Sequence, residues 1–287
     1  MPEGHTLRRL ALDLADAFAG REVAVSSPQG RFVAEAALLD GTVLTGADSA
    51  GKHLFVEFED DRIVHVHLGL IGKLDVRPAP VPPPVGQVRL RVVSTGSTTE
   101  GTATGDGRYA DLRGATRCDL VGPVRKAEVV AGLGPDPLRP DADPDRAWRR
   151  IKASGRPVGE LLMDQSVLAG VGNVYRAEVL FRHRIDPHRP GRTLRVGQWR
   201  AMWDDLVVLM AEGVRVNRID TVRPEHTPEA MGRPPRVDDH GGEVYVYRRS
   251  GRECHVCGAT VRTAVLAGRN LFWCPRCQPR FRSRALQ

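Results

Sequence analysis

Residues 254–277 read CHVCGATVRTAVLAGRNLFWCPRC, and their four cysteines form two Cys-x-x-Cys turns separated by sixteen residues. This spacing is typical of a structural zinc site, because each turn aims two thiolates at one point and two turns complete a tetrahedron. The alternatives are a disulfide framework, or thiols that are buried as small apolar side chains. We predict one structural zinc ion with four ligands: Cys254, Cys257, Cys274 and Cys277.

The residues between the two cysteine pairs predict a β-hairpin. Leu271 to Trp273 have the apolar and aromatic character of a strand, and Gly268 to Asn270 before them predict a tight turn. Such a turn would present the guanidinium of Arg269 at the tip of a hairpin that the metal pins.

The charge balance of the whole chain favours an acidic polymer as partner. The 287 residues hold 42 Lys and Arg against 35 Asp and Glu, a formal net charge of +7. Residues 246–287 alone contain nine arginines and one acidic residue, Glu253, so a basic stripe surrounds the predicted metal site. The alternative for this stripe is a solvated surface that keeps the protein soluble.

The chain has no apolar run near the roughly 20 residues that a membrane helix needs. Asp13 and Asp16 interrupt the amino-terminal segment, so it does not resemble a cleaved leader. With four cysteines assigned to metal, only Cys118 remains, and nothing points to disulfides. We expect a soluble protein of a reducing cytoplasm without a membrane partner.

Residues 1–122 are predicted to form an antiparallel β-sandwich or barrel capped by one helix. Apolar residues from Leu7 to Phe18 recur at helical spacing, with Thr6 as the expected N-cap and Gly20 as the stop. The stretches 78–84 and 94–107 are expected to be loops. Short alternating or β-branched runs predict these strands: Glu22–Ser26, Thr42–Ser49, His53–Phe58, Ile63–Leu68, Lys73–Val76, Val88–Val93 and Cys118–Val121.

Residues 123–243 are predicted to form a mostly helical domain, and residues 244–287 the zinc finger, which makes the fold class multidomain α+β. The segment 217–243 is rich in Pro, Gly, Asp and Arg, so we expect a long irregular loop. Periodicity near 3.6 predicts these helices: Val124–Leu133, Asp143–Ala153, Val158–Leu168, Gly172–Phe181 and Arg195–Val214.

Pro2 offers an unusual nucleophile at the amino terminus. Removal of Met1 would free a secondary amine, and α-amino groups have a pKa of roughly 7.7–8.0 against about 10.4 for Lys. Attack on a sugar carbon would give an iminium that stays cationic and withdraws electrons, with Glu3 beside it for general acid–base help. Many proteins begin with Met-Pro, so this position alone does not establish a catalytic role.

The segment Gly170 to Glu178 predicts a phosphate seat. Two glycines allow a tight double turn, and Asn173 then opens a helix, so backbone N–H groups and a side-chain amide converge at a positive helix end. The alternative is an ordinary corner between two helices.

Four separated motifs in the right order now carry a family resemblance. The chain opens with Met-Pro-Glu-Gly, has Gly51-Lys52-His53 before a strand, and contains the double turn at 170–178 and Gly268-Arg269-Asn270 inside the four-cysteine hairpin. It resembles the bacterial family of formamidopyrimidine-DNA glycosylase and endonuclease VIII from Pro2 to Gln278. The resemblance implies a monomeric DNA glycosylase and AP lyase of base excision repair that acts on damaged double-stranded DNA, with no nucleotide cofactor.

The resemblance also implies a role for each matching position. Pro2 would attack C1′ of the damaged nucleotide, and Glu3 would protonate the sugar as its ring opens. Lys52 would contact a DNA phosphate from a β-turn and assist catalysis. Asn173 and Arg269 would grip the phosphates that flank the flipped nucleotide, and Arg269 would also act in the second elimination. The resemblance also implies DNA contacts for His67, Leu70 and Arg113. Among these, Leu70 would intercalate between bases.

Departures from the family pattern bear on the lesion. Purine-directed members begin Pro-Glu-Leu-Pro and carry an Arg-Arg-Phe loop, whereas this chain begins Pro-Glu-Gly-His and has no Phe in the loop expected at Tyr109–Ala115. It is more similar to the endonuclease VIII branch, especially the actinobacterial group, which implies oxidised pyrimidines as substrates. That branch often has glutamate where Thr6 stands, and a Gln-Leu-Tyr wedge where Gly69–Ile71 stands.

Three alternative functions therefore stay open. The chain could be a purine-directed glycosylase, or an enzyme that acts mainly as an AP lyase. It could also be a zinc-ribbon DNA-binding protein without catalysis, in which case Pro2 and Glu3 would be incidental.

Overall fold

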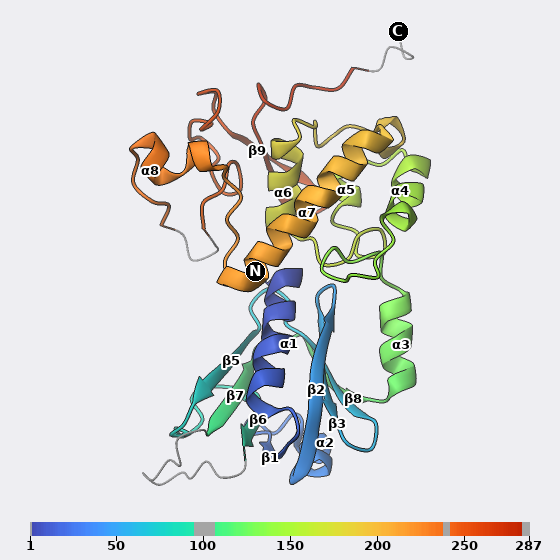
Figure 1. Ribbon diagram of the computed structural model, residues 1–287, viewed down its shortest axis with the longest axis vertical. Helices are drawn as coiled ribbons and strands as arrows, with labels where there is room; N and C mark the ends of the chain where they lie inside the picture. Colours follow the sequence, from blue (N-terminus) through green and yellow to red (C-terminus); the bar gives the residue numbers. More distant parts are fainter. Residues whose placement is uncertain (1, 95–106, 238–241, 283–287) are drawn as a thin grey trace. The chain divides into compact units, whose positions relative to one another are not determined.

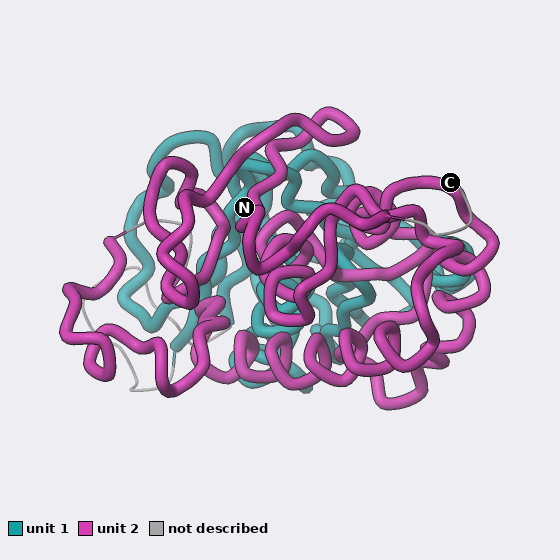
Figure 2. The backbone as a smooth tube through the Cα atoms, turned by 90° about the horizontal axis from the view of Figure 1, so that it is seen from above, with its two compact units in different colours: residues 1–132 teal, residues 133–287 magenta. Residues whose placement is uncertain are grey.

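The computed structural model describes residues 2–94, 107–237 and 242–282. The chain divides into two compact units, residues 1–132 and 133–287 (Figure 2). This division falls later than the predicted boundary at 122, because helix α3 (Pro123–Ala131) belongs to the first unit. Cysteines and hairpin residues of the zinc finger share one apolar core with the helices of the second unit. A separate zinc-finger domain stays a prediction.

The first unit contains a single eight-stranded sheet in which all neighbouring strands are antiparallel. The strands follow the order β5-β7-β6-β1-β2-β3-β4-β8. Their bounds are β1 (Arg21–Ser26), β2 (Thr42–Ala50), β3 (His53–Phe58), β4 (Arg62–His67), β5 (Lys73–Pro78), β6 (Val88–Ser94), β7 (Arg108–Arg113) and β8 (Arg117–Val121).

Helix α1 (Gly4–Phe18) packs against this sheet through one apolar face (Figure 1). Leu7, Leu14 and Phe18 are buried in the same core as apolar side chains of the strands. The helix contacts β2 and β3 and also β5 and β7, which stand far apart in the strand order, so the sheet curves around it. The predicted antiparallel β domain with a capping helix is confirmed.

Three details of the first unit differ from the sequence predictions. Helix α1 begins at Gly4 with Glu3 as N-cap, so Thr6 is not the cap; its hydroxyl accepts a hydrogen bond from the Glu3 N–H at 3.4 Å. The expected loop at Tyr109–Ala115 is largely strand β7, paired on both sides. Helix α2 (Val33–Leu39) was not predicted. The expected loop at 94–107 lies mostly outside the described residues.

The second unit is built around helix α6 (Asn173–Arg182), in which every residue except Arg182 is buried. The other helical elements of this unit are α4 (Pro144–Ala153), α5 (Val158–Leu161), α7 (Val196–Val216), α8 (Pro228–Met231) and the short 3-10 turns η1 (Gly191–Thr193) and η2 (Pro224–His226). The hairpin consists of β9 (Arg262–Leu266) and β10 (Arg269–Trp273). Among the described residues, no helix is both long enough and apolar enough to span a membrane.

Two predictions for the second unit are wrong in detail. The helix expected at Val158–Leu168 ends at Leu161, because Asp164 forms a local turn in which its carboxylate accepts the backbone N–H and the hydroxyl of Ser166. The segment 217–243 is not irregular throughout, since it includes η2 and α8.

A buried carboxylate joins α6 to the segment that leads into the zinc finger. Glu178 is fully buried, and its two oxygens accept hydrogen bonds from the Thr221 hydroxyl at 2.6 Å and from the backbone N–H groups of Tyr245, Val246 and Tyr247 at 2.7–2.9 Å. These four donors satisfy the buried carboxylate. Glu178 therefore braces the fold.

We expect Glu178→Gln to lower the free energy of unfolding of the second unit by about 3 kcal/mol, because one amide N–H₂ would face backbone donors and hydrogen bonds to a charged acceptor are lost. Urea unfolding followed by circular dichroism measures this change. The control is Glu128→Gln on α3, where an exposed pair with Arg125 contributes little. Equal, small effects of both substitutions would contradict the brace.

Candidate functional site

The first unit gathers its predicted site residues at one end. Pro2 is half-buried, and Glu3 is fully buried at the start of α1. Arg8 in the second turn of α1 pairs with Asp48 near the end of β2 at 3.1 Å, so the start of the helix lies beside the β2–β3 turn (Figure 1). That turn contains Lys52. The structure therefore places Pro2, Glu3 and Lys52 at the same end of this unit.

His67 ends strand β4 at this same end of the unit. Burial, followed by the positive charges of Lys52 and Arg117, lowers the pKa of His67. Its Nδ1 accepts the backbone N–H of Gly69 at 3.2 Å, so the neutral ring carries its proton on Nε2. An Nε2–H beside a lysine is suited to an acidic ligand.

The β4–β5 connection presents two apolar side chains to solvent. Leu70 is 60% exposed and Ile71 is 84% exposed. Gly69 has φ +70° and an added Cβ would lie 2.4 Å from Thr116, while a Cβ on Gly72 would lie 2.2 Å from the Leu68 carbonyl. The two glycines therefore allow a tight backbone turn that exposes the apolar side chains of Leu70 and Ile71 at its tip. Ile71 was missed as a candidate, although its place next to Leu70 was a signal.

Arg113 is already engaged in an ion network. Its guanidinium donates to Asp111 at 2.7 Å and to the Val85 carbonyl at 3.0 Å. Asp111 is buried and also accepts two hydrogen bonds from Arg91, at 2.7 and 2.8 Å. Arg113 thus closes a structural network at the end of β7, and its predicted DNA contact stays a prediction.

Two histidines, the half-buried His53 and the buried His65, lie next to the Lys52 turn. His53 Nδ1 and His65 Nε2 are 2.8 Å apart, and the His65 ring stacks on Phe55. Burial is the main cause that lowers the pKa of each imidazole to about 4, with nearby His and Arg charges adding to it. One ring donates to the other, so at neutral pH both are uncharged.

We expect this pair to destabilise the first unit in acid. Because the folded-state pKa of about 4 lies below the ordinary histidine pKa of 6.5, the folded protein binds fewer protons than the unfolded chain between these values. The free energy of unfolding should fall as the pH decreases from 6.5 to 4, and His65→Phe should reduce that slope. Denaturant unfolding at several pH values measures it, and equal slopes in both proteins would contradict the assignment.

The four cysteines of the second unit converge on one point. All four Sγ atoms lie within 4.8 Å of one another, with Cys257 and Cys274 at 3.5 Å and Cys254 and Cys277 at 3.8 Å. A tetrahedral zinc with Zn–S bonds of about 2.3 Å requires S···S separations near 3.8 Å. These separations are too long for disulfides, and the cysteines are free. The residues fit one structural zinc, as predicted.

The hairpin turn begins one residue and ends two residues earlier than the predicted turn at Gly268 to Asn270. Ala267 and Gly268 form it with φ of 47° and 72°, and Arg269 is the first residue of β10, opposite Leu266. Arg269 is exposed, and its guanidinium makes no hydrogen bond or ion pair with the part of the chain that the structure describes. It is available to an external acidic group.

Asn173 lies against the hairpin rather than alone at the helix end. It is the first residue of α6 and is buried, and its Nδ2 donates to the carbonyl of Asn270 at 2.9 Å. Arg176 donates to the same carbonyl at 2.9 Å and to the Asn173 side-chain oxygen. The structure thus brings Asn173 next to the strand that begins with Arg269. Sequence reasoning missed Arg176, whose helical position gave no signal.

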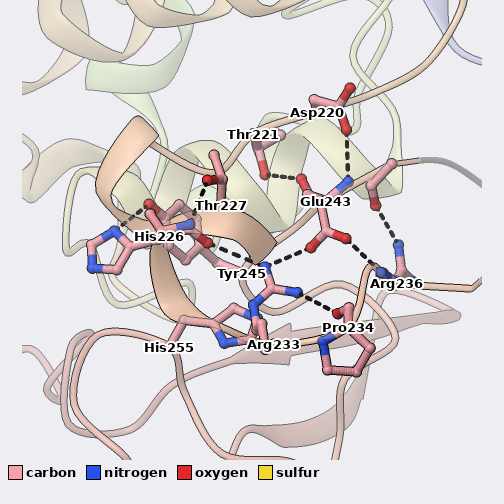
Figure 3. A network of polar contacts seen from close by, with 12 residues as sticks. Asp220, Thr221, His226, Thr227, Arg233, Pro234, Arg236, Glu243, Tyr245 and His255 are labelled. Atoms are coloured by element: carbon pink, nitrogen blue, oxygen red, sulfur yellow. Dashed lines mark hydrogen bonds and ion pairs between the residues drawn. The ribbon is translucent and has the colours of Figure 1, made fainter.

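A polar network closes the base of segment 217–243 (Figure 3). The Glu243 carboxylate accepts from the guanidinium of Arg233 at 2.6 Å and from the backbone N–H of Arg236, and Asp220 accepts the Glu243 N–H at 2.7 Å. The Thr221 N–H donates to the Glu243 carbonyl at 2.8 Å. Both ends of the described segment are therefore fastened together.

Comparisons with known proteins agree with this arrangement. Three family models match: the formamidopyrimidine-DNA glycosylase N-terminal domain at residues 1–118, the formamidopyrimidine-DNA glycosylase H2TH domain at 133–223, and the zinc finger found in FPG and IleRS at 251–280. The first two cover most of the chain.

Curated relatives and solved structures match over nearly the full length. Endonuclease 8 1 of Mycobacterium tuberculosis is 52% identical, covering 97% of this chain and 100% of the relative. Formamidopyrimidine-DNA glycosylase of Thermus thermophilus is 32% identical, with 97% of each chain covered. A Lactococcus lactis FPG mutant in complex with Fapy-dG-containing DNA has the same fold, with a TM-score of 0.75, 21% identity, and coverage of 97% and 100%.

These matches define a zinc-finger DNA glycosylase of DNA repair, with a β domain and a helix-two-turn-helix domain. The chain belongs to the formamidopyrimidine-DNA glycosylase and endonuclease VIII family, and the predicted likeness to the actinobacterial endonuclease VIII group is confirmed.

Proposed function

We propose that the protein is a bifunctional DNA glycosylase and AP lyase that removes oxidised pyrimidines from double-stranded DNA. The observation that carries this proposal is the start of the chain, where Pro2 directly precedes a fully buried Glu3 at the first turn of α1. The same end of the unit presents Lys52 and an exposed apolar tip. A nucleophile, an acid, a cation and a wedge are the parts that base removal from a duplex needs.

The chemistry would begin with a bond between the Pro2 nitrogen and C1′ as the bond from C1′ to the damaged base breaks. The nitrogen gives up its proton to the departing base, which leaves neutral, and Glu3 protonates the ring oxygen as the sugar opens. The product is an iminium, which stays cationic because a prolyl nitrogen has no second proton to lose. Its charge acidifies C2′–H, so loss of that proton expels the 3′ phosphate and a second elimination expels the 5′ phosphate.

DNA binding would involve residues of both units. Lys52 and His67 would contact backbone phosphates, while Leu70 together with Ile71 would fill the space left by the extruded base. Arg269 and Asn173 would hold the phosphates next to the lesion. The zinc shell of four thiolates is closed, so the metal supplies hairpin geometry and offers no position for a reacting water.

The preference for pyrimidines is supported by the 52% identity to a protein named Endonuclease 8 1. The alternative is a purine-directed enzyme, since a relative named formamidopyrimidine-DNA glycosylase is 32% identical. Release of thymine glycol faster than 8-oxoguanine from matched duplexes supports the first, and the reverse order supports the second. We further propose a cytoplasmic monomer that requires no nucleotide cofactor.

We expect borohydride to trap a covalent adduct between the protein and abasic DNA once Met1 is removed. Pro2→Gly, which keeps an α-amine, should retain part of the trapping, while an uncleaved amino-terminal extension should abolish it. Gel analysis of the reduced adduct, with mass spectrometry of the amino terminus, measures both. Lys52→Ala keeps the α-amine and should still form the adduct at the amino terminus, at a reduced rate because it removes the proposed phosphate contact.

Strong trapping by a protein with a blocked amino terminus would eliminate the proline mechanism and point to Lys52. No trapping by the wild-type protein with a free Pro2, alongside intact DNA binding, would favour the non-catalytic DNA-binding alternative.

For Arg269→Ala we expect weaker DNA binding by about tenfold, a salt slope that is shallower by about one, and loss of δ-elimination product more than of base release. Filter binding at several salt concentrations and analysis of the cleaved ends measure these effects. Arg215→Ala at the end of α7 removes the same charge from an exposed position and should change neither. A wild-type amount of δ product in Arg269→Ala would refute the role.

A further inference from the structure

A hollow opens at the base of the zinc hairpin, at the opposite end of β10 from Arg269. Its volume is about 460 Å³, within the range of small-ligand sites. We call it the base groove. Its lining includes Asp186, His188, Arg262, Trp273, Gln278 and Arg280.

The base groove holds polar groups that the fold does not use. Within residues 2–94, 107–237 and 242–282, the guanidiniums of Arg262 and Arg280 and the indole N–H of Trp273 have no hydrogen bond or ion pair. Other arginines of the zinc finger differ: Arg249 and Arg276 donate to backbone carbonyls. Two cations and an aromatic donor that line one hollow without protein partners indicate a ligand.

The acidic residue of the base groove is occupied by the fold. Asp186 is buried, and its carboxylate accepts the backbone N–H groups of His188 at 2.9 Å and Phe281 at 2.8 Å. The Phe281 ring lies under the guanidinium of Arg189, 4.4 Å from its centroid, and this holds neighbouring Arg280 at the rim. The Asp186 oxygens thus face backbone donors, and the unused charges in the lining are positive.

The chemistry of the lining matches a nucleotide. Arginine binds phosphate through paired N–H donors. Trp273 is half-buried, with His188 edge-on to it at 5.4 Å, and an indole face stacks on any base. A hollow with an aromatic platform and two cations is the arrangement by which proteins hold an unpaired base and its phosphate.

The position of the base groove favours a DNA strand over a free nucleotide. Arg269 and Trp273 stand at opposite ends of β10, and the fully buried Leu271 lies between them. The two residues are about 13 Å apart along the strand. That distance corresponds to a few nucleotides of one DNA strand.

We propose that the base groove is a second DNA-binding site, which takes an unpaired nucleotide a few positions from the phosphate that Arg269 holds. The inference rests on the proposed role of Arg269 in DNA binding. The protein would then bind a duplex that continues into a single strand more tightly than a blunt duplex.

The test compares an undamaged blunt duplex with the same duplex carrying a six-thymidine overhang at one end. The wild-type protein should bind the overhang duplex about tenfold more tightly, as one stacked base and its phosphate contribute. Arg262→Ala combined with Arg280→Ala should abolish this difference and leave blunt-duplex affinity unchanged. Trp273→Phe should retain part of it, because a phenyl ring still stacks. Arg215→Ala with Arg252→Ala is the charge-matched control.

Four outcomes decide the matter. Equal wild-type affinity for both duplexes overturns the proposal, and so does an equal loss on both duplexes in the double variant with its zinc content intact. Tight binding of free thymidine monophosphate, competing with the overhang, overturns the assignment to a strand. In the variant with both Arg262→Ala and Arg280→Ala, borohydride trapping on a blunt abasic duplex should stay at the wild-type level. Absence of trapping in the wild-type protein would refute the proposed function and not the second binding site, because overhang binding is measured without catalysis.

Discussion

The second unit depends on one buried carboxylate. A charge without water must have its donors in place, and Glu178 finds them in Thr221 and in three consecutive backbone N–H groups of the segment 245–247. That segment continues to Arg249, whose guanidinium donates to the carbonyls of Tyr245 and Glu253, immediately before the first zinc ligand. Helix α6, the segment 245–247 and the zinc turn must therefore form together.

The same helix carries the contact that orients the hairpin. Asn173 and Arg176 both donate to the Asn270 carbonyl, so the start of α6 fixes the strand that presents Arg269. A metal alone would hold the cysteine turns. The turn at the other end of the hairpin, whose two strands have five residues each, would stay free to move. Thiolate coordination at one end and the two side-chain donors at the other fix the hairpin at both ends.

Periodicity and turn chemistry predicted much of this fold. Strands β1 to β6 and β8 and helices α1, α4, α6 and α7 follow their sequence patterns, because their apolar residues recur with the period of a strand or of a helix. Helix α2 was missed because it buries only Ala36 and Leu39, too few to show a period. The end of α5 depends on the Asp164 turn, and the strand character of β7 depends on pairing with β5 and β6.

The metal site was predictable because the type and spacing of the four cysteines carry its chemistry, whereas the catalytic roles of Pro2 and Glu3 stay predictions. A contact that depends on a partner distant in sequence was not predictable. The hydrogen bonds of Arg113 to Asp111, which the buried Arg91 also engages, had no signal in the sequence, and the predicted DNA contact of Arg113 stays a prediction. Thr6 departs from the glutamate that is frequent in its branch, and here its hydroxyl accepts the N–H of Glu3.

The β4–β5 connection contains two positions that require glycine and two positions whose side chains can vary. Gly69 and Gly72 have no room for a side chain, whereas the side chains of Leu70 and Ile71 touch solvent and constrain nothing around them. Substitutions at these two tip positions can therefore accumulate without a loss of stability. If Leu70 and Ile71 fill the space of the extruded base as proposed, selection can change the set of base pairs that the protein opens by exchanging two side chains, while the backbone that carries them stays unaltered.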